Sequence, residues 1–187
     1  KNFRNNNLSQ GLDDQFYSDS QTINLFNTLI KEEGENFVYK MLDSQNIGNV
    51  NNIHKFKQKI YSSNEIFHIK YLSKINNYLK LKNSSLICEI GPGYGCLVSK
   101  ILKIYNCKII LIDLPESNFL SAYFLKSLFP EKKFFLTSDI KNNEVKQKDI
   151  LDNDIIIICP WDNLPNIKFD LFINSRSMME MNKESIK

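Results

Sequence analysis

The fold is decided by the stretch Leu86-Ile87-Cys88-Glu89-Ile90-Gly91-Pro92-Gly93-Tyr94-Gly95. Its mostly apolar first half, 86–90, predicts a buried strand, and the glycines that alternate along 91–95 predict a tight loop. Residues 96–105 then predict a helix, because their apolar side chains recur at helical spacing. A strand, a glycine-rich loop and a helix in this order bring a nucleotide-like ligand against the backbone of an α/β sheet. The alternative is a plain strand-to-helix turn, for which one glycine would suffice.

The spacing of the glycines separates two classes of ligand. Dinucleotide-binding loops follow the pattern Gly-x-Gly-x-x-Gly, whereas this loop is Gly-x-Gly-x-Gly, with Cys96 where the third dinucleotide glycine would stand. Glu89 precedes the first glycine by two residues, and its carboxylate would repel a pyrophosphate but attract a positively charged ligand. The pattern Glu-x-Gly-x-Gly-x-Gly resembles motif I of the class I methyltransferases that use S-adenosylmethionine (SAM), a sulfonium donor without a phosphate.

A second acidic residue, Asp113, follows the strand expected at 108–112 and lies eighteen residues after Gly95. A carboxylate at this place is suited to accept hydrogen bonds from both ribose hydroxyls of a nucleotide-like ligand. NAD- and SAM-binding proteins share the feature, so Asp113 indicates the fold more than the ligand. Because Pro115 follows closely, Asp113 also suits the N-cap of a helix, and one residue can do both.

The composition is that of an ordinary globular protein. The chain has 187 residues, 42% of them hydrophobic and 24% charged, and its net charge of +3 is too small to predict a nucleic-acid partner. Its lysines are scattered, which is typical of solvated faces. Two histidines, and four cysteines without a Cys-x-x-Cys pair, predict neither a metal centre nor a disulfide framework. No apolar run approaches the ~20 residues that span a bilayer, and without a signal peptide we expect a cytoplasmic protein.

The pattern of apolar residues divides the chain into an N-terminal segment, 1–83, and a sheet domain, 84–187. Apolar stripes at helical spacing predict that the N-terminal segment is an α-helical accessory cap. From residue 84 strands and helices alternate, which predicts an α/β fold with a Rossmann-like parallel sheet. Strands are expected at 86–90, 108–112, 155–159 and 170–174, a further short apolar run lies at 134–136, and helices are expected at 96–105 and 116–128.

The strand expected at 155–159 ends in Pro160-Trp161-Asp162. At the carboxyl edge of a parallel sheet, an aromatic ring can stack on an adenine and an acid can accept a hydrogen bond from its amine. In a purely structural interpretation Trp161 covers the sheet edge and Asp162 caps a turn. Ser138-Asp139 is a second candidate for the acid beside the adenine, and we prefer Asp162.

The strand expected at 170–174 ends in a polar cluster, Asn174-Ser175-Arg176-Ser177. Ser177 and Glu180 are three residues apart and would share one face of a helix, although a capping box accounts for this pair equally well. A cap explains neither Asn174 nor Arg176. We therefore expect Asn174 to contact the cofactor, and Arg176 and Ser177 to contact the acceptor.

Three short segments together resemble the sugar O-methyltransferases of bacterial surface-polysaccharide clusters: Asp113-Leu114-Pro115-Glu116, the Pro-Trp pair at 160–161, and Asn174-Ser175-Arg176-Ser177-Met178-Met179-Glu180-Met181. The resemblance covers 86–187. It implies the class I methyltransferase fold, SAM as cofactor and a sugar hydroxyl as acceptor, with small-molecule and protein acceptors left open. The class I sheet normally has seven strands, so the chain is expected to be incomplete at its C-terminal end.

Methyl transfer to a hydroxyl needs in-line positioning and a general base. Glu180 is our candidate for this base, and we expect no metal. One rival interpretation is an NAD(P)-dependent oxidoreductase, against which the glycine spacing and Glu89 argue. Another is a non-catalytic, methyltransferase-like binding or scaffold domain. The residues expected to contact the cofactor are Glu89, Gly91, Pro92, Gly93, Gly95, Asp113, Leu114, Trp161, Asp162 and Asn174.

Overall fold

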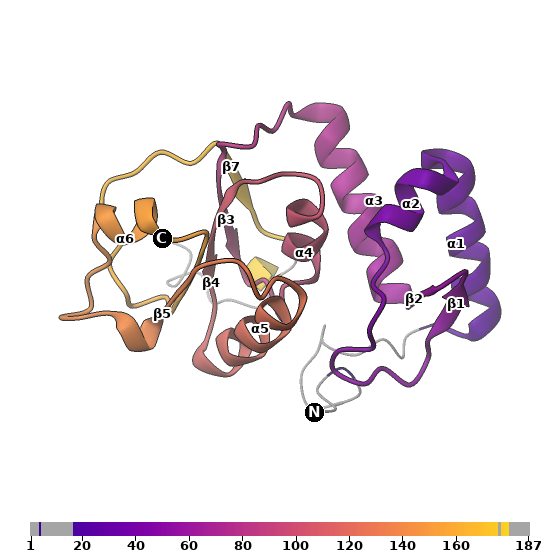
Figure 1. Ribbon diagram of the computed structural model, residues 1–187, viewed down its shortest axis with the longest axis horizontal. Coiled ribbons are helices and arrows are strands. Elements are labelled where there is room, and N and C mark those ends of the chain that lie inside the picture. The colour runs from indigo at the N-terminus through magenta and orange to yellow at the C-terminus, as the bar shows by residue number, and fades with distance from the viewer. Residues whose placement is uncertain (1–3, 5–16, 176, 180–187) are drawn as a thin grey trace. The chain divides into compact units, whose positions relative to one another are not determined.

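The chain forms two compact units in the computed structural model, which describes residues 4, 17–175 and 177–179 (Figure 1). One unit comprises residues 1–80 and 99–104, and the other comprises 81–98 and 105–187. The helix α4, Cys96–Leu102, contributes residues to both units. Arg176 and Glu180, which the sequence analysis assigned to the acceptor site and to catalysis, lie outside the described residues.

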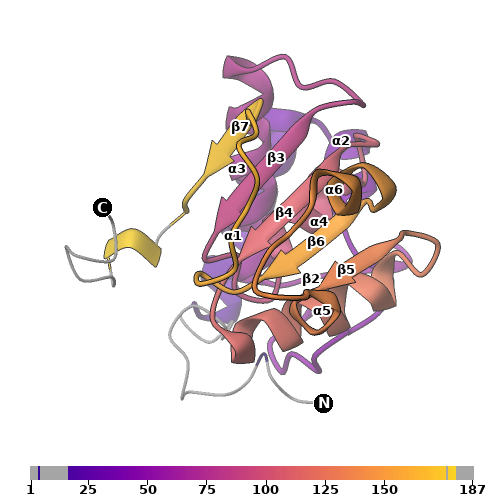
Figure 2. The same cartoon turned by 90° about the vertical axis from the view of Figure 1, so that its left-hand side faces the viewer.

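The second unit contains a parallel sheet of five strands in the order β5-β6-β4-β3-β7 (Figure 2). The predicted α/β class with a Rossmann-like sheet is therefore confirmed. The predicted strands are present, although β6 ends one residue early and β7 is one residue shorter at each end. The strands are β3 (Leu86–Ile90), β4 (Lys108–Ile112), β5 (Phe134–Leu136), β6 (Ile155–Ile158) and β7 (Leu171–Ile173).

The sheet is covered on both faces, which explains why its central strands are apolar throughout. The helix α5, Pro115–Leu128, lies on one face, and α6, Gln147–Asp152, lies on the other (Figures 1 and 2). Ile150 of α6 packs in a buried cluster with Ile110, Ile156 and other apolar residues. The central strands β4 and β6 therefore bury alternate side chains in two separate apolar layers.

Strand β3 is the point at which the winding of the sheet reverses. The chain leaves β3 for β4 on one side, and β7 later pairs with β3 on the other side. In open α/β sheets, ligands bind outside the carboxyl ends of the strands at such a reversal. Because all five strands are parallel, this edge also carries the residues that follow β4, β6 and β7.

The first unit consists of three helices and a two-stranded hairpin. The helices are α1 (Asp19–Glu33), α2 (Glu35–Met41) and α3 (Ser63–Tyr78), and the strands β1 (His54–Phe56) and β2 (Lys59–Tyr61) pair antiparallel. The sequence analysis did not predict the hairpin. Its signal was the alternation of charged and apolar residues along 54–61, which is typical of a half-exposed strand.

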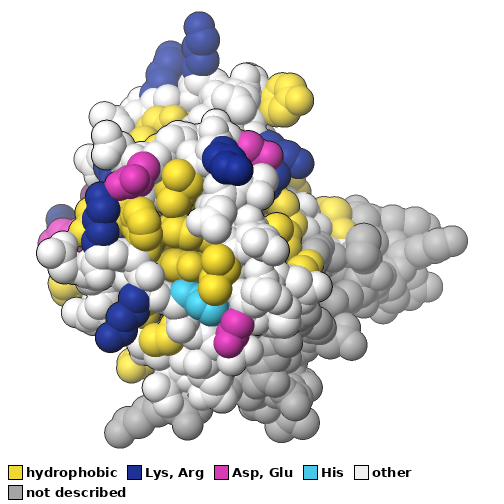
Figure 3. All heavy atoms as spheres, turned by 90° about the vertical axis from the view of Figure 1, so that its right-hand side faces the viewer, with side chains coloured by type: hydrophobic (Ala, Val, Ile, Leu, Met, Phe, Trp, Pro, Cys, Tyr) yellow, Lys and Arg dark blue, Asp and Glu magenta, His cyan; other side chains and the backbone are white. Residues whose placement is uncertain are grey.

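The core of the first unit is apolar and partly aromatic. Phe26 stacks on Tyr61 with ring centroids 3.9 Å apart, and Leu29 and Ile69 are buried beside other aliphatic side chains. Some apolar side chains remain at the surface, and Figure 3 shows a group of them gathered beside a histidine. In the described part of the chain, no helix is long and apolar enough to cross a membrane.

Candidate functional site

The glycine loop that follows β3 has a backbone that other residues rarely adopt. Gly91, Gly93 and Gly95 have φ angles of +69°, +58° and +86°, in the left-handed region that favours glycine. A Cβ on Gly95 would lie 3.2 Å from Cδ1 of Leu125 on α5. Tyr94 of the same loop is buried and packs edge-on against Phe124, with centroids 4.9 Å apart. The loop is therefore packed closely on α5, and its glycines are required by its shape.

Asp113 ties the end of β4 to the glycine loop. Its Oδ2 accepts a hydrogen bond from the Gly93 amide at 3.3 Å, and its Oδ1 accepts one from the Leu114 amide at 2.8 Å. Burial raises the pKa of Asp113 above its usual range, while hydrogen bonds from Leu114, Gly93 and Ser117 act in the opposite direction. The residue that caps α5 is Leu114, with Pro115 at the first helical position.

Glu89 is a buried acid directly before the loop. It pairs in register with Leu111 of β4 and Ile173 of β7, and its side chain is only 1% exposed. An ionised carboxylate at this place opposes the approach of an anionic pyrophosphate and favours a positively charged ligand.

Beyond β6, the contacts of Asp162 are those of a turn cap. Its Oδ2 accepts hydrogen bonds from the Cys159 amide at 2.8 Å and from Oγ1 of Thr137 at 3.2 Å. Asp139, the second candidate, accepts a hydrogen bond from the Leu136 amide at 2.9 Å. Trp161 is 55% exposed, so its ring is largely open to solvent.

The remaining predicted contacts flank the loop. Pro92 is buried within it, and Leu114 is 55% exposed at the start of α5. Asn174 and Ser177 follow β7, and both donate hydrogen bonds to the carbonyl of Ile90, at 3.0 and 3.1 Å. The structure thus brings the ends of β3, β4 and β7 together through hydrogen bonds that Asn174 and Ser177 donate and one that Asp113 accepts from the Gly93 amide.

Asn118 of α5 is a positioning residue that the sequence analysis missed. Its Nδ2 donates to the carbonyl of Asp113 at 2.8 Å and to that of Ile158 at 2.7 Å. It therefore joins the ends of β4 and β6. The available signal was a polar residue among the apolar positions of the helix expected at 116–128.

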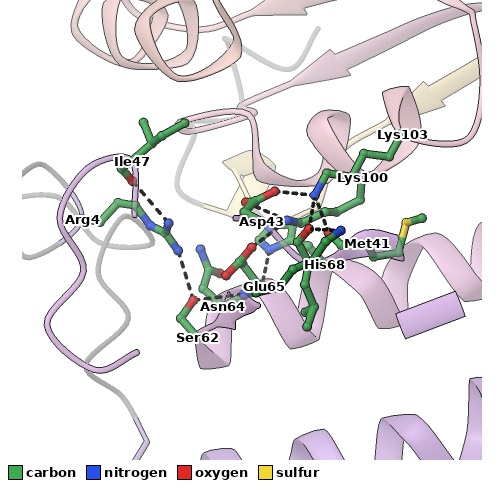
Figure 4. Close-up of polar contacts among 12 residues, drawn as sticks. Arg4, Met41, Asp43, Ile47, Ser62, Asn64, Glu65, His68, Lys100 and Lys103 are labelled. Carbon is green, nitrogen blue, oxygen red and sulfur yellow. Dashed lines mark hydrogen bonds and ion pairs between the residues drawn. The ribbon is translucent and has the colours of Figure 1, made fainter. Parts of the chain in front are cut away.

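A cluster of buried charges lies in the first unit (Figure 4), and two of its lysines come from α4 and the residues just after it, shortly after the glycine loop in sequence. Lys100 is 0% exposed, and its Nζ lies 3.0 Å from Oδ2 of Asp43 and 2.7 Å from Oε1 of Glu65. Lys103 contacts the same Asp43 and donates to the Met41 carbonyl at 2.7 Å. We use the name ion cluster for the five charged residues Arg4, Asp43, Glu65, Lys100 and Lys103.

The two carboxylates of the ion cluster are shifted in opposite directions. Burial opposes the ionisation of Asp43, but Lys100 and Lys103 outweigh it and hold the pKa of Asp43 well below its usual range. Burial raises the pKa of Glu65 to about 7, and the charge of Asp43 adds to this, while Lys100 and Arg4 act against it. Scattered lysines are typical of solvated faces, so the sequence analysis missed the cluster.

The structure contains little that suits a metal ion or a disulfide. Among the described residues, no group of histidine, cysteine and acidic side chains could hold a metal. The four cysteines are buried free thiols. Burial raises the pKa of Cys88 to about 12, so this thiol is unreactive at neutral pH.

Comparison with curated proteins finds two related sequences, while no family model matches the chain. Both are named "Ribosomal RNA small subunit methyltransferase A", from Mycoplasma mycoides subsp. mycoides and Mycoplasma capricolum subsp. capricolum. Each is 29% identical over 98 residues, which are 52% of this chain and 32% of the relative. The aligned stretch is thus about a third of the length of these relatives.

Two solved structures resemble the chain weakly. A protein-L-isoaspartate O-methyltransferase has a TM-score of 0.44 at 11% identity, covering 82% of this chain and 47% of its own. Coclaurine N-methyltransferase, solved with N-methylheliamine and S-adenosylhomocysteine (SAH), has a TM-score of 0.39 at 13% identity. The match covers 86% of this chain and 45% of the coclaurine N-methyltransferase chain.

These findings bear on the predictions to different extents. The sequence relatives are methyltransferases, in agreement with the class I type of fold that the motif predicts. The sugar O-methyltransferase family is not confirmed, since the relatives are named for ribosomal RNA.

Proposed function

We propose that this chain carries the cofactor site of a SAM-dependent methyltransferase. The observation that supports it best is the arrangement of two acids around the glycine loop. Asp113 is hydrogen-bonded to the Gly93 amide, and Glu89 is buried at the end of β3 directly before the loop. A nucleoside with a positively charged sulfonium suits this arrangement, whereas the pyrophosphate of NAD does not.

The residues at this edge fit SAM in their chemistry. Asp113 accepts hydrogen bonds from two backbone amides and from Ser117, and the acceptor capacity that a carboxylate retains beyond these would bind the ribose hydroxyls. Glu89, when ionised, would favour the positive end of the ligand. The exposed side chains of Leu114 and Trp161 are apolar surfaces for the adenine ring, and Asp162 is our candidate for the adenine amine.

In this proposal the protein contributes positioning and a base. SAM, when bound, supplies a methyl group on an activated sulfur, so the donor needs no further activation by the protein. The loop and Asp113 hold the nucleoside so that the acceptor oxygen attacks in line, and such alignment lowers barriers by up to ~7–11 kcal/mol in ideal cases. Glu180 is our proposed base for the acceptor hydroxyl.

A sugar hydroxyl of a glycan precursor is the acceptor that we propose, with Arg176 and Ser177 as its contacts. Its support is the resemblance of the segments at 113–116 and 174–181 to sugar O-methyltransferases. The curated relatives favour a second candidate, RNA, because both are named as ribosomal RNA methyltransferases. The free thiols of all four cysteines suit a reducing compartment, and we propose the cytoplasm.

Calorimetric titration tests the cofactor. SAM and SAH should both bind in saturable fashion, and NAD should not, because the loop lacks the glycine spacing of dinucleotide-binding loops. Binding of NAD alone would overturn the proposal in favour of an oxidoreductase. If the folded chain binds none of the three, the scaffold interpretation is favoured instead.

Methyl incorporation from labelled SAM then tests the acceptor. We would compare nucleotide-activated sugars with ribosomal RNA as substrates, using the longest available form of the protein. Label in the sugar fraction supports the glycan proposal. Label in RNA alone would replace it with the RNA candidate, while leaving the cofactor proposal intact.

A further inference from the structure

The carbonyl of Ile90, the last residue of β3, is held by the loop that follows β7. The parallel ladder between these strands ends at the pair Glu89 and Ile173. One residue further, the Ile90 oxygen accepts hydrogen bonds from Nδ2 of Asn174 at 3.0 Å and from Oγ of Ser177 at 3.1 Å. A carbonyl oxygen has two lone pairs. Side chains thus continue the pairing of β3 with β7 where the backbone ladder stops.

We call the contact of Asn174 and Ser177 with the Ile90 carbonyl the clasp. It uses all the hydrogens that these two side chains can donate. Nδ2 of Asn174 also donates to Oγ of Ser177 at 2.5 Å, and Oδ1 of Asn174 accepts from the Met178 amide at 3.2 Å. These partners define the orientation of the amide, because the Met178 amide needs an acceptor and the Ile90 oxygen needs a donor. Neither side chain has a donor left for a ligand while the clasp is closed.

Gly91 fits between the clasp and β4. Its amide donates to the Ile112 carbonyl at 2.9 Å, and its φ is +69°. A Cβ at this position would overlap the side chain of Ser177. The first glycine of the loop is therefore required by Ser177 and by the turn itself, rather than by close approach of a ligand.

We propose that Asn174 and Ser177 are positioning residues: they hold the Ile90–Gly91 peptide, and with it the glycine loop, in the shape that binds SAM. This inference rests on the proposed function and revises two of its roles, because Asn174 was expected to contact the cofactor and Ser177 the acceptor. A loop with positive φ at three glycines loses much conformational freedom on ordering. Hydrogen bonds at its entrance reduce the number of alternative conformations that the free protein can sample.

The first test compares Ser177→Ala with Ser85→Ala. Ser85 is a matched control because it is buried, it precedes β3 at the opposite edge of the sheet, and its Oγ accepts the Lys82 amide at 3.1 Å. In ligand-free protein, Ser177→Ala should speed hydrogen exchange of the amides in 91–95. It should weaken SAM binding by about threefold to tenfold, which corresponds to one ordinary hydrogen bond.

Ser85→Ala should leave both quantities unchanged. Unaltered exchange in 91–95 for Ser177→Ala would overturn the positioning role, even if SAM affinity falls. If wild-type protein binds no SAM, the proposed function fails, whereas the exchange measurement in ligand-free protein still tests the clasp.

The second test is a double-mutant cycle of Gly91→Ala and Ser177→Gly, read by the same exchange and binding measurements. In the wild-type background, Gly91→Ala introduces both the overlap with Ser177 and the strain of a positive φ. In the Ser177→Gly background only the strain remains, so the substitution should be less harmful there. Equal effects in the two backgrounds would contradict the clasp.

Discussion

The ion cluster of the first unit and Asp113 of the second unit differ in how their charged groups are held. In the first, Lys100, Asp43 and Glu65 are at most 3% exposed and satisfy one another. In the second, Asp113 lies half-buried at a strand end and accepts hydrogen bonds from backbone amides. Charges that neutralise one another have little left for a ligand, whereas a carboxylate held by the backbone keeps acceptor capacity. We therefore expect the ion cluster to govern stability and the sheet edge to govern binding.

The largest expected effect is on stability, from Lys100→Met. Removing the ammonium leaves Glu65 and one side of Asp43 buried without their main counter-charge. We expect the free energy of unfolding to fall by about 3–5 kcal/mol, measured by urea denaturation. The double variant with Glu65→Gln should recover part of this loss, because one buried charge is then removed with its partner.

Lys70→Met is the control for that substitution. Lys70 pairs with Glu32 at 3.0 Å, and both side chains are more than 40% exposed. Its loss should cost less than about 1 kcal/mol. Equal destabilisation by the two lysine substitutions would contradict the distinction between the buried cluster and the surface.

The next effect is on binding, from Gly93→Val. Gly93 has a φ of +58°, which a β-branched residue adopts only under strain. In the proposed site the side chain would also face the nucleoside, so SAM affinity in calorimetry should fall by about 100-fold or more. Gly34→Val is the control, because Gly34 has a φ of +85° with nothing within 4 Å of its Cβ position. It should strain the first unit without changing SAM affinity.

A smaller loss of binding is expected from Asp113→Asn. Hydrogen bonds to a charged group contribute about 1.5–3 kcal/mol, so SAM affinity should fall roughly tenfold to 100-fold. Asp170→Asn is the control, since that exposed carboxylate also accepts a hydrogen bond from a backbone amide, that of Leu86 at 2.8 Å. If both substitutions weaken SAM equally, Asp113 has no special role.

The remaining prediction is a pH dependence of stability that belongs to the ion cluster. The pKa of Glu65 is raised from 4.5 to about 7, so the folded state binds more protons than the unfolded chain between these values. Its contribution to stability is thus present below pH 4.5 and lost as the pH rises through 7. Asp43 acts in reverse, because its lowered pKa contributes stability above 3.8 that is lost in acid.

The substitution Glu65→Gln isolates the contribution of Glu65 to the pH dependence of stability. The variant cannot ionise, so its stability relative to wild type should increase between pH 5 and pH 7.5, as measured by urea unfolding across that range. A difference that stays constant with pH would show that Glu65 remains ionised in the folded protein throughout.

Much of the sheet unit was predictable because its signals are local. An apolar run before alternating glycines, as at 86–95, predicts both β3 and the loop. The next apolar run, at 108–112, predicts β4 and places Asp113 directly after it. The hairpin at 54–61 was missed although its alternation is visible in the sequence. The alternating segment is only a few residues long, and apolar residues at helical spacing on either side of it led to the prediction of an all-helical segment.

What the sequence determined by itself was the class of fold and the chemical character of one edge, since glycine at positive φ and an acid after a buried strand are local requirements. Tertiary structure decided which polar residues work together. Lys100 meets Asp43 across 57 positions of chain, and Asn174 meets Ile90 across 84. No periodicity encodes such distant pairs. They arise because a parallel sheet aligns strand ends from remote segments, and because a buried charge must find a counter-charge wherever the fold provides one.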